Sequence, residues 1–300
     1  MDSPHGAAVK AEDFGLKGPR GWAFRGVGID AAPGSLIAVE GPSGSGRTCL
    51  LLALTGRMKP TRGHAEVGGH HLPKRMTAVR RIAALGPVSG VNELDQALTV
   101  AEQLREGALL QRHYGAPVRA MLRPRAERRA AAEARIADAL EAAGLDLAAL
   151  PKGERTSVRD LERLEAVRLS VAIALLGSPA LLALDDLDLK LSDTERVEAW
   201  DLLRSVAARG ITVLAVCSEA PADAIVLRTS PEEPDAPEAP EASAASDTPA
   251  AAESDADAEA DEGSGTDAKT DTKTDAKTDA KTENDDTKGA DDALAEAGRA

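Results

Sequence analysis

Aromatic side chains, cysteines and long apolar runs are scarce in this chain of 300 residues. Phe, Trp and Tyr make up 2% of it, and the two cysteines, Cys49 and Cys217, lie too far apart in sequence for a zinc motif. No apolar run approaches the roughly 20 residues that a membrane-spanning helix needs, and we find no signal peptide. These absences predict a cytosolic protein with reduced thiols and no structural metal.

Positive charge is scarce toward the C-terminal end. Residues 231–300 carry 22 acidic and 6 basic side chains, a net charge of −16, which leaves +2 for residues 1–230. They include the repeat DAKTDTKTDAKTDAKT and almost nothing large and apolar. Because so little surface can be buried to offset the chain entropy, we expect 231–300 to be a disordered acidic tail. Solvation is its expected role, with binding of a basic partner as the alternative.

Leu, Val, Ile and Ala are dense in residues 1–230 and predict one compact α/β domain. Strand, helix and strand in succession near its end indicate a parallel sheet. The expected elements are a strand at 35–41, a Gly-rich turn, a helix ending at Gly56, a hairpin at 64–72, a central strand at 81–86, a helical block at about 99–177, and strands at 180–186 and 211–219 on either side of a helix.

The turn after the first strand reads GPSGSGRT, from Gly41 to Thr48. It satisfies every position of the phosphate-loop pattern G-x-x-x-x-G-K-[ST] except the lysine, and it lies between a strand and a helix as that mechanism requires. Glycines let backbone N–H groups turn inward on a phosphate, and the helix N-terminus adds partial positive charge. A Gly-rich turn without a ligand is the alternative. The residues expected to bind a nucleotide are Gly41, Ser43, Gly44, Ser45, Gly46, Arg47 and Thr48.

Two oxygen ligands for Mg²⁺ are expected beside this loop. Thr48 offers a hydroxyl, and Asp185, which closes the strand LLALD, offers a carboxylate. Arg47 keeps the positive charge of the missing lysine but is a longer, planar fork. We therefore expect weaker binding of the nucleotide rather than none.

Residues 10–229 resemble the ATP-binding cassette family, the nucleotide-binding subunits of ABC transporters. The resemblance rests on GVGIDAAPGSLIAVEGPSGSGRTCLLLALTGRMKPTRGHAEVGGHHL and on VRLSVAIALLGSPALLALDD, which is similar to the helix and strand that follow the family's signature. It implies an α/β P-loop NTPase of ABC type, with a mostly parallel sheet, an N-terminal antiparallel β part and an inserted helical subdomain. It also implies ATP and Mg²⁺ as cofactors, a homo- or heterodimer of cassettes, and a transmembrane partner.

Six positions depart from the family's pattern, all of them catalytic or near the nucleotide. Arg47 replaces the loop lysine, Asp186 the glutamate that orients the attacking water, LERLE at 161–165 the signature Leu-Ser-Gly-Gly-Gln, Pro87 a glutamine, Ser218 a histidine, and Gly18 the aromatic that stacks on adenine. As the catalytic residue, Asp186 is one methylene shorter, so its oxygen is expected to stop short of the water. Trp22 lies close enough to stack on adenine instead, with packing of Trp22 or Phe24 in the first sheet as the alternative.

Two functions remain open on these grounds, beside a third and weaker option, a chain that no longer binds nucleotide and keeps only the fold for interaction. The first is an ATP-binding subunit that binds Mg-ATP and drives a membrane partner from the inner face of the membrane, with slow or partner-dependent hydrolysis. The second is a degenerate cassette that binds nucleotide without turnover and acts as a regulatory or scaffolding subunit. A partner cassette with an intact signature would separate them, because Glu162 and Glu165 place negative charge where the opposing γ-phosphate would lie.

Three further clusters have plainer interpretations. The arginine-rich span 112–144 fits a solvated helix face or a protein contact better than a nucleic-acid site, so no nucleic acid is expected. Asp188 and Asp193 are interpreted as part of an interface segment rather than a two-metal cluster. His70 and His71 are adjacent, so on a strand their side chains point to opposite faces and cannot share a metal.

Overall fold

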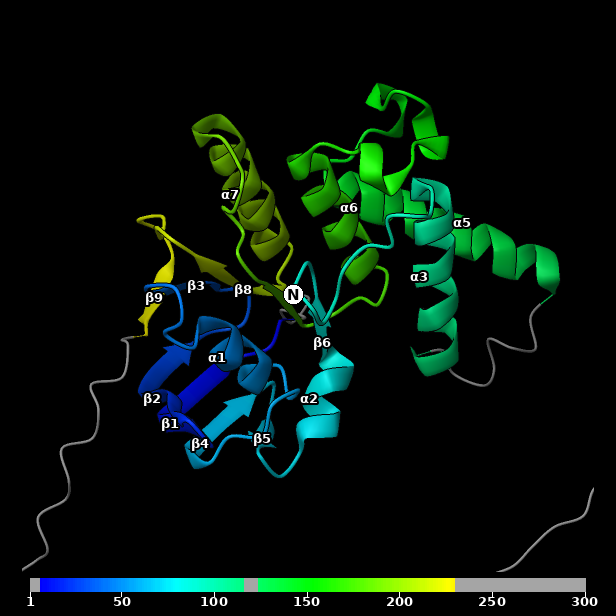
Figure 1. Cartoon of the computed structure of the whole chain (residues 1–300). Helices are drawn as coiled ribbons and strands as arrows, with labels where there is room; N and C mark the ends of the chain where they lie inside the picture. The colour runs from blue at the N-terminus through cyan, green and yellow to red at the C-terminus, as the bar shows by residue number, and fades with distance from the viewer. Residues whose placement is uncertain (1–5, 116–123, 230–300) are drawn as a thin grey trace, which may run out of the picture. The chain divides into compact units, whose positions relative to one another are not determined.

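The computed structural model describes residues 6–115 and 124–229, without the side chains of 111–115. The chain divides into two units, Met1–Ala239 and Pro240–Ala300, and every described residue belongs to the first. The predicted tail at 231–300 lies outside the described residues. Figure 1 shows the described part as two sheets beside a block of helices.

An antiparallel sheet contains the N-terminal strands and the predicted hairpin. The two aromatics Phe14 and Phe24 pack in its core, with their ring centroids 5.7 Å apart. Gly68 and Gly69 form the hairpin turn, both with positive φ, as expected where a tight turn needs left-handed backbone. Its strand order is β2-β1-β4-β5, with β1 (Val9–Gly18), β2 (Gly21–Ala31), β4 (Arg62–Val67) and β5 (His70–Leu72).

The predicted parallel sheet is confirmed, with five strands in the order β6-β7-β8-β3-β9. The expectation of a central strand at 81–86 was wrong, because Arg81 and Ile82 end the helix α2 (Met76–Ile82) and the remaining strand lies at the sheet edge. A buried apolar run looks the same in a central and an edge strand, so sequence alone does not order them. The strands are β3 (Leu36–Glu40), β6 (Ala83–Leu85), β7 (Leu181–Leu184), β8 (Thr212–Cys217) and β9 (Ile225–Arg228).

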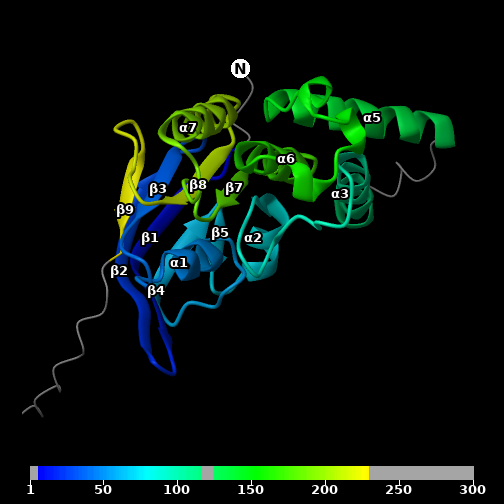
Figure 2. The same cartoon turned by 45° about the horizontal axis from the view of Figure 1, so that its top comes forward.

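Each face of the parallel sheet packs on its own core. Along β3, Leu36 and Ala38 belong to the core under α6 (Arg163–Leu175) and α7 (Asp193–Ala208), whereas Ile37 and Val39 belong to the core with α1 (Arg47–Leu54) and the antiparallel sheet. Figure 2 shows α7 and α1 on opposite sides of these strands. Burial on both faces explains why the strands read as continuous apolar runs.

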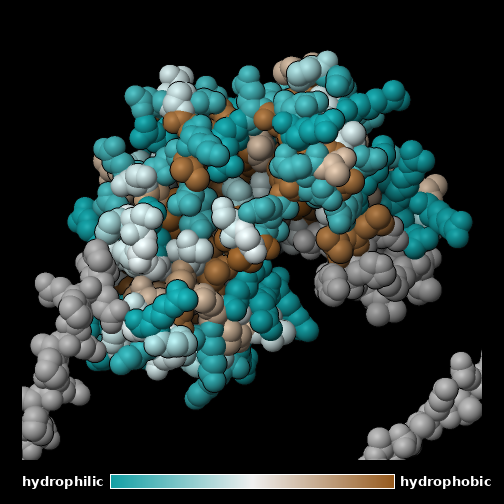
Figure 3. Space-filling model, viewed as in Figure 1, coloured by the Kyte–Doolittle hydropathy of each residue, from teal (hydrophilic) through white to brown (hydrophobic). Residues whose placement is uncertain are grey.

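Helices and short turns make up most of the described residues of the block expected at about 99–177. It contains α3 (Val100–Gly115), α5 (Arg125–Ala142), three short 3₁₀ turns (Leu147–Ala149, Gly153–Arg155 and Val158–Asp160) and α6. Its surface is largely hydrophilic in Figure 3, although Leu109 and Leu110 of α3 are half exposed. Within the part of the chain that the structure describes, no helix has the length and apolarity needed to cross a membrane.

The topology brings three strand ends together. Because β3, β7 and β8 run parallel and adjacent, their carboxyl ends meet at one edge of the sheet. Residues 41–48 follow β3, Asp185 follows β7, and Cys217 ends β8. Ligands of open α/β sheets bind outside such an edge, so the fold places the predicted motif residues where a site can form.

Candidate functional site

Glycines of the loop after β3 are required by close backbone contacts. Gly46 has φ 81° and lies directly against the carbonyl of Ala23, so a Cβ atom there would overlap that oxygen. Gly41 lies against Thr229, whose hydroxyl is 2.6 Å from the buried Ser45 hydroxyl. Gly44 also has positive φ, at 83°, but open space surrounds it. The loop is therefore held from both sides by β2 and by the residue after β9.

The N-terminus of α1 is left open by its own side chains. Gly46 is the N-cap residue and offers no side-chain oxygen to the first helical N–H groups, and no acidic residue lies in the first turn. Unpaired N–H groups and the helix dipole together favour an anion at this position. The loop and helix thus form a backbone cradle for phosphate.

Thr48 and Asp185 lie together at the mouth of this cradle. The Thr48 hydroxyl donates to Oδ2 of Asp185 at 2.7 Å, across 137 residues of sequence. Burial raises the pKa of the Asp185 carboxyl above its ordinary value; the Thr48 hydrogen bond opposes this, and the adjacent charge of Asp186 adds to it. A hydroxyl and a carboxylate are oxygen ligands of the kind that Mg²⁺ prefers, and neutralisation by a cation would offset the cost of the buried charge.

Arg47 points toward the ends of β7 and β8. Its Nη1 donates to the backbone carbonyl of Cys217 at 3.0 Å, and its Nη2 lies 3.6 Å from Oδ1 of Asp186. Burial raises the pKa of the Cys217 thiol to about 12, so this cysteine is an inert thiol at neutral pH. The structure thus brings the substituted loop cation and the expected catalytic carboxylate into one ion pair.

Asp186 occupies an unusual backbone conformation. Its φ is 44°, in the left-handed region, and its N–H donates to Oδ1 of Asp185 at 3.1 Å. The next turn is tied down as well, because Leu189 N–H donates to the carbonyl of Asp186. The backbone position of Asp186 is therefore fixed beside the end of β7.

The residues expected at the signature form the start of α6. Glu162 is the N-cap residue and Glu165 the third helical residue, and together they make a reciprocal capping box. Oε2 of Glu165 accepts from the N–H of Glu162 at 2.9 Å. The capping box thus engages the N–H groups of Glu162 and Glu165, and both carboxylates bring negative charge to this helix end. Arg163 donates to the carbonyl of Leu189, which links this helix end to the segment after β7.

The remaining substituted positions have structural partners. The carbonyl of Pro87 accepts from the N–H of Asp185 at 2.9 Å. The N–H of Ser218 donates to Oδ2 of Asp188 at 2.7 Å, and Asp193 pairs with Arg196. No group of three or more His, Cys, Asp or Glu side chains within 6–115 and 124–229 is arranged to hold a metal ion.

Trp22 lies in β2, one residue before the carbonyl that contacts Gly46. The ammonium of Lys17 lies 5.4 Å from its ring centroid, and the guanidinium of Arg62 lies 6.0 Å from it. Such cation–π contacts fit the alternative of packing at the sheet surface. Stacking of Trp22 on adenine stays a prediction.

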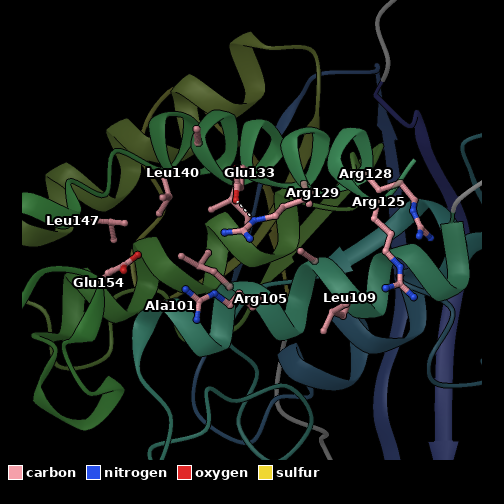
Figure 4. A pocket seen from close by; sticks show the side chains of 15 residues that line it. Ala101, Arg105, Leu109, Arg125, Arg128, Arg129, Glu133, Leu140, Leu147 and Glu154 are labelled. Atoms are coloured by element: carbon pink, nitrogen blue, oxygen red, sulfur yellow. Dashed lines mark hydrogen bonds and ion pairs between the residues drawn. The ribbon is translucent and has the colours of Figure 1, made fainter. Parts of the chain in front are cut away.

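A groove of about 880 Å³ lies apart from this site, between α3 and α5 (Figure 4). Leu104, Ile136 and Leu140 contribute apolar lining. Arg105 and Arg125 also line it, from the two different helices. The described part of the arginine-rich span, in α5, is thus partly a groove wall and partly an exposed helix face.

Three contacts escaped the motif analysis. They are the Ser45–Thr229 hydroxyl pair, the Arg47 contact with the carbonyl of Cys217, and the Arg163 contact with the carbonyl of Leu189. Two of them involve backbone carbonyls, which carry no sequence signal at all. The capping box of α6 escaped it as well, because its N-cap residue is Glu162 rather than the Ser or Thr of the usual pattern.

Comparisons with known proteins agree with this geometry. Residues 24–187 match the family described as ABC transporter. Among curated relatives, the Nod factor export ATP-binding protein I of Paraburkholderia xenovorans is 30% identical over 192 residues, covering 63% of this chain and 55% of the relative. The daunorubicin resistance ATP-binding protein DrrA3 of Streptomyces coeruleorubidus is 33% identical over 193 residues, covering 64% and 54%. The chain therefore spans about half the length of the curated relatives it matches.

A solved structure shares the fold. The dimeric structure of MJ0796, a bacterial ABC transporter cassette, aligns with a TM-score of 0.56 at 20% identity, covering 75% of this chain and 97% of that one. At this identity the likeness concerns the fold alone, and it confirms the expected P-loop NTPase architecture of ABC type. Since the family match covers more than half of its residues, the chain belongs to the ABC transporter family, with the fold of an ATP-binding cassette.

Proposed function

We propose that this protein is the ATP-binding subunit of an ABC transporter-like complex, with Mg-ATP as its ligand. The observation that carries the proposal is the open N-terminus of α1 beside the Thr48–Asp185 pair, 2.7 Å apart. The phosphate cradle and the two oxygen ligands lie next to each other at the carboxyl ends of β3 and β7, as binding of a Mg-nucleotide requires. Residues 1–230 are the proposed cassette, with the helical subdomain at about 99–177.

Each loop residue has a proposed role in binding. Backbone N–H groups between Gly41 and Thr48 would hold the phosphates, while Thr48 and Asp185 would hold Mg²⁺. Bound Mg²⁺ would supply charge neutralisation on the β- and γ-phosphates. Ser45 supports the loop through Thr229 rather than by touching a ligand, since its hydroxyl is buried in that contact. Trp22 remains the proposed stacking partner for adenine.

Weak hydrolysis is proposed on the strength of Asp186. It is the proposed catalytic carboxylate, but it is shorter than glutamate and lies 3.6 Å from Arg47, which competes for its oxygens. A carboxylate already paired with a cation is a weaker hydrogen-bond acceptor for an attacking water. We therefore propose turnover that is slow or depends on a partner.

The self-capped start of α6 favours a second candidate function. In a homodimer, both composite sites would present Glu162 and Glu165 instead of free N–H groups. A non-hydrolysing cassette with a regulatory or scaffolding role accounts for this end of the helix. In a heterodimer, a partner with an intact signature would restore turnover, and the protein would then act as the ATP-hydrolysing subunit proposed first.

A transmembrane subunit is the proposed partner, which places the protein at the cytoplasmic face of the membrane. The relatives named above are described as ATP-binding proteins of Nod factor export and of daunorubicin resistance. The exposed arginines of α5 and the groove between α3 and α5 support a protein contact at the helical block. The transported substrate would be set by the membrane subunit.

The test is Mg²⁺-dependent ATP binding and single-turnover hydrolysis by the full chain. Thr48→Ala and Asp185→Asn are each expected to weaken binding in Mg²⁺ by at least about tenfold, because each removes one proposed oxygen ligand. Thr77→Ala is the matched control, since Thr77 contacts Arg80 in α2. Binding without cleavage would select the second candidate, and equal binding by all four chains would overturn the proposed metal site.

A further inference from the structure

The guanidinium of Arg47 bridges the ends of two strands. One nitrogen donates to the carbonyl of Cys217 at the end of β8, and another lies 3.6 Å from Asp186, two residues after β7. The Arg47 side chain is only 15% exposed. We infer that Asp186 is a positioning residue. It holds the guanidinium of Arg47 against the end of β8 and thereby limits the affinity of the site for nucleotide.

The shapes of the two side chains fit this role. A guanidinium presents several N–H donors in a fixed plane, so it can serve the carbonyl of Cys217 and the carboxylate of Asp186 at once. The ammonium of a lysine is instead a compact point charge on a shorter stem. Arg47 and Asp186 thus combine a longer base with a shorter acid in one contact.

The backbone around Asp186 keeps its carboxylate in place. Its φ of 44° and its N–H bond to Asp185 fix the backbone of Asp186 at the end of β7, and its carboxylate lies 3.6 Å from Arg47. Arg47 is thereby held at the strand ends, while the N–H groups of the α1 N-terminus remain open. In this arrangement the phosphate cradle consists of backbone alone, and the loop cation contributes only after the contact with Asp186 opens.

Opening the contact has an electrostatic cost. Asp185 and Asp186 are adjacent carboxylates, and the guanidinium of Arg47 lies 3.6 Å from Oδ1 of Asp186. Without Arg47, the two carboxylates would be left side by side. A divalent cation at Thr48 and Asp185 would offset this cost. Release of Arg47 and binding of the metal are therefore coupled, so that nucleotide without metal gains little from Arg47.

The expected effect is modest because Asp186 is 39% exposed and water screens the pair. If the contact leaves only a minority of molecules with Arg47 free to bind phosphate, the apparent affinity equals the intrinsic affinity multiplied by that fraction. Removing the Asp186 charge should therefore tighten nucleotide binding about three- to tenfold. The inference rests on the proposed function, since it concerns the same nucleotide.

The test measures binding of a fluorescent ATP analogue with Mg²⁺ to the full chain. Four variants are compared with the unaltered protein: Asp186→Asn, Arg47→Lys, the double variant, and Glu219→Gln as control. Glu219 is an exposed acid two residues after Cys217, so its removal reports the general effect of losing a negative charge. We expect Asp186→Asn to raise the affinity for the analogue. The affinity should change less than about twofold for Glu219→Gln, and less than about twofold when Asp186→Asn is added to the Arg47→Lys chain.

Two binding results would overturn the positioning role. Equal tightening by Asp186→Asn in the unaltered chain and in the Arg47→Lys chain would mean simple charge repulsion, and weaker binding would mean that Asp186 supports the nucleotide directly. Thermal unfolding without nucleotide gives an independent readout, because the cycle of the two substitutions should be non-additive if the side chains interact. If no variant binds ATP, the proposed function fails together with the positioning role, while the unfolding cycle still shows whether the ion pair exists.

Discussion

Two helix N-termini of this cassette differ in how they are capped. The N-terminus of α1 has glycine at its N-cap, no side-chain cap and no acidic residue in its first turn. The N-terminus of α6 is closed by a capping box of Glu162 and Glu165. Both helix N-termini have the same helix dipole, so the difference in side chains leaves the N-terminus of α1 open to an anion and caps that of α6 with carboxylates.

The comparison explains which half of a composite ATP site this chain could provide. Its own phosphate loop keeps the backbone geometry that binding depends on. The end of α6 that a partner's nucleotide would meet has lost the glycines and gained two carboxylates. Under the proposed function, the chain would keep the half that binds its own nucleotide while the half offered to a partner is altered, which is why a partner with a different signature enters the proposal.

Breaking the open terminus at Gly46 should have the largest effect. Gly46→Ala forces a Cβ onto the carbonyl of Ala23 in a left-handed conformation, so we expect an unfolding free energy lower by at least about 2 kcal/mol and loss of ATP binding. Gly44→Ala is the matched control, because it has the same sign of φ in open space. Thermal unfolding should show a clearly smaller loss for the control, and equal losses would mean that the contact with Ala23 does not matter.

Sealing the open terminus with a carboxylate should have the next largest effect. Cys49 stands at the third helical position of α1, the position that Glu165 holds in α6. Cys49→Glu is expected to weaken Mg-ATP binding by about tenfold or more, because its charge competes with phosphate for the same N–H groups. Cys49→Gln has the same shape without the charge and serves as control in titrations. Equal affinities for the two variants would contradict the proposed phosphate position.

Removing the two carboxylates from the N-terminus of α6 tests the comparison from the other helix. Glu162→Ser combined with Glu165→Gln keeps a Ser-x-x-Gln capping box and removes both charges, so the free energy of unfolding should change by less than about 1 kcal/mol. We expect stronger ATP-dependent self-association, measured by sedimentation. The unaltered chain is the reference, and no gain in association would mean that these charges do not limit dimer formation.

An ion-pair cluster on α7, away from the N-termini of α1 and α6, should give the smallest change in unfolding free energy and serves as a baseline. Arg204 of α7 binds Asp223 through two nitrogens, at 2.8 and 2.9 Å, and Asp201 through a third. Because these groups are partly exposed, Arg204→Gln should cost at most about 1 kcal/mol at neutral pH.

The pH dependence of that loss has a definite sign. The hydrogen bonds from Arg204 lower the pKa of Asp223, so its stabilising contribution is present above the unfolded pKa near 4 and is lost as the pH falls through the lower folded value. Unfolding curves of the unaltered chain and the Arg204→Gln chain should therefore converge in acid. A difference that stayed constant down to about pH 2 would exclude this ion pair as its cause.

Much of the fold was predictable because it depends on local patterns. Buried parallel strands are continuous apolar runs, and the phosphate loop is a contiguous motif, so β3, β7, β8 and Gly41–Thr48 were predicted with nearly correct bounds. The helix α2 and the strand β9 were missed, since seven and four residues give too short a pattern. The place of β6 at the edge depends on its pairing, which no local pattern encodes.

The sequence by itself determined the class of fold and the phosphate loop, because both rest on residue types at short spacing, and it named Thr48 and Asp185 as candidate oxygen ligands. Their contact across 137 residues depends on the sheet. Only the tertiary structure decided where Arg47 points and what Asp186 does. The partners of Arg47 are a backbone carbonyl 170 residues away and a carboxylate beyond a different strand. Their meeting depends on the order of strands in the sheet, and that order is set by packing across the whole domain rather than by any stretch of sequence.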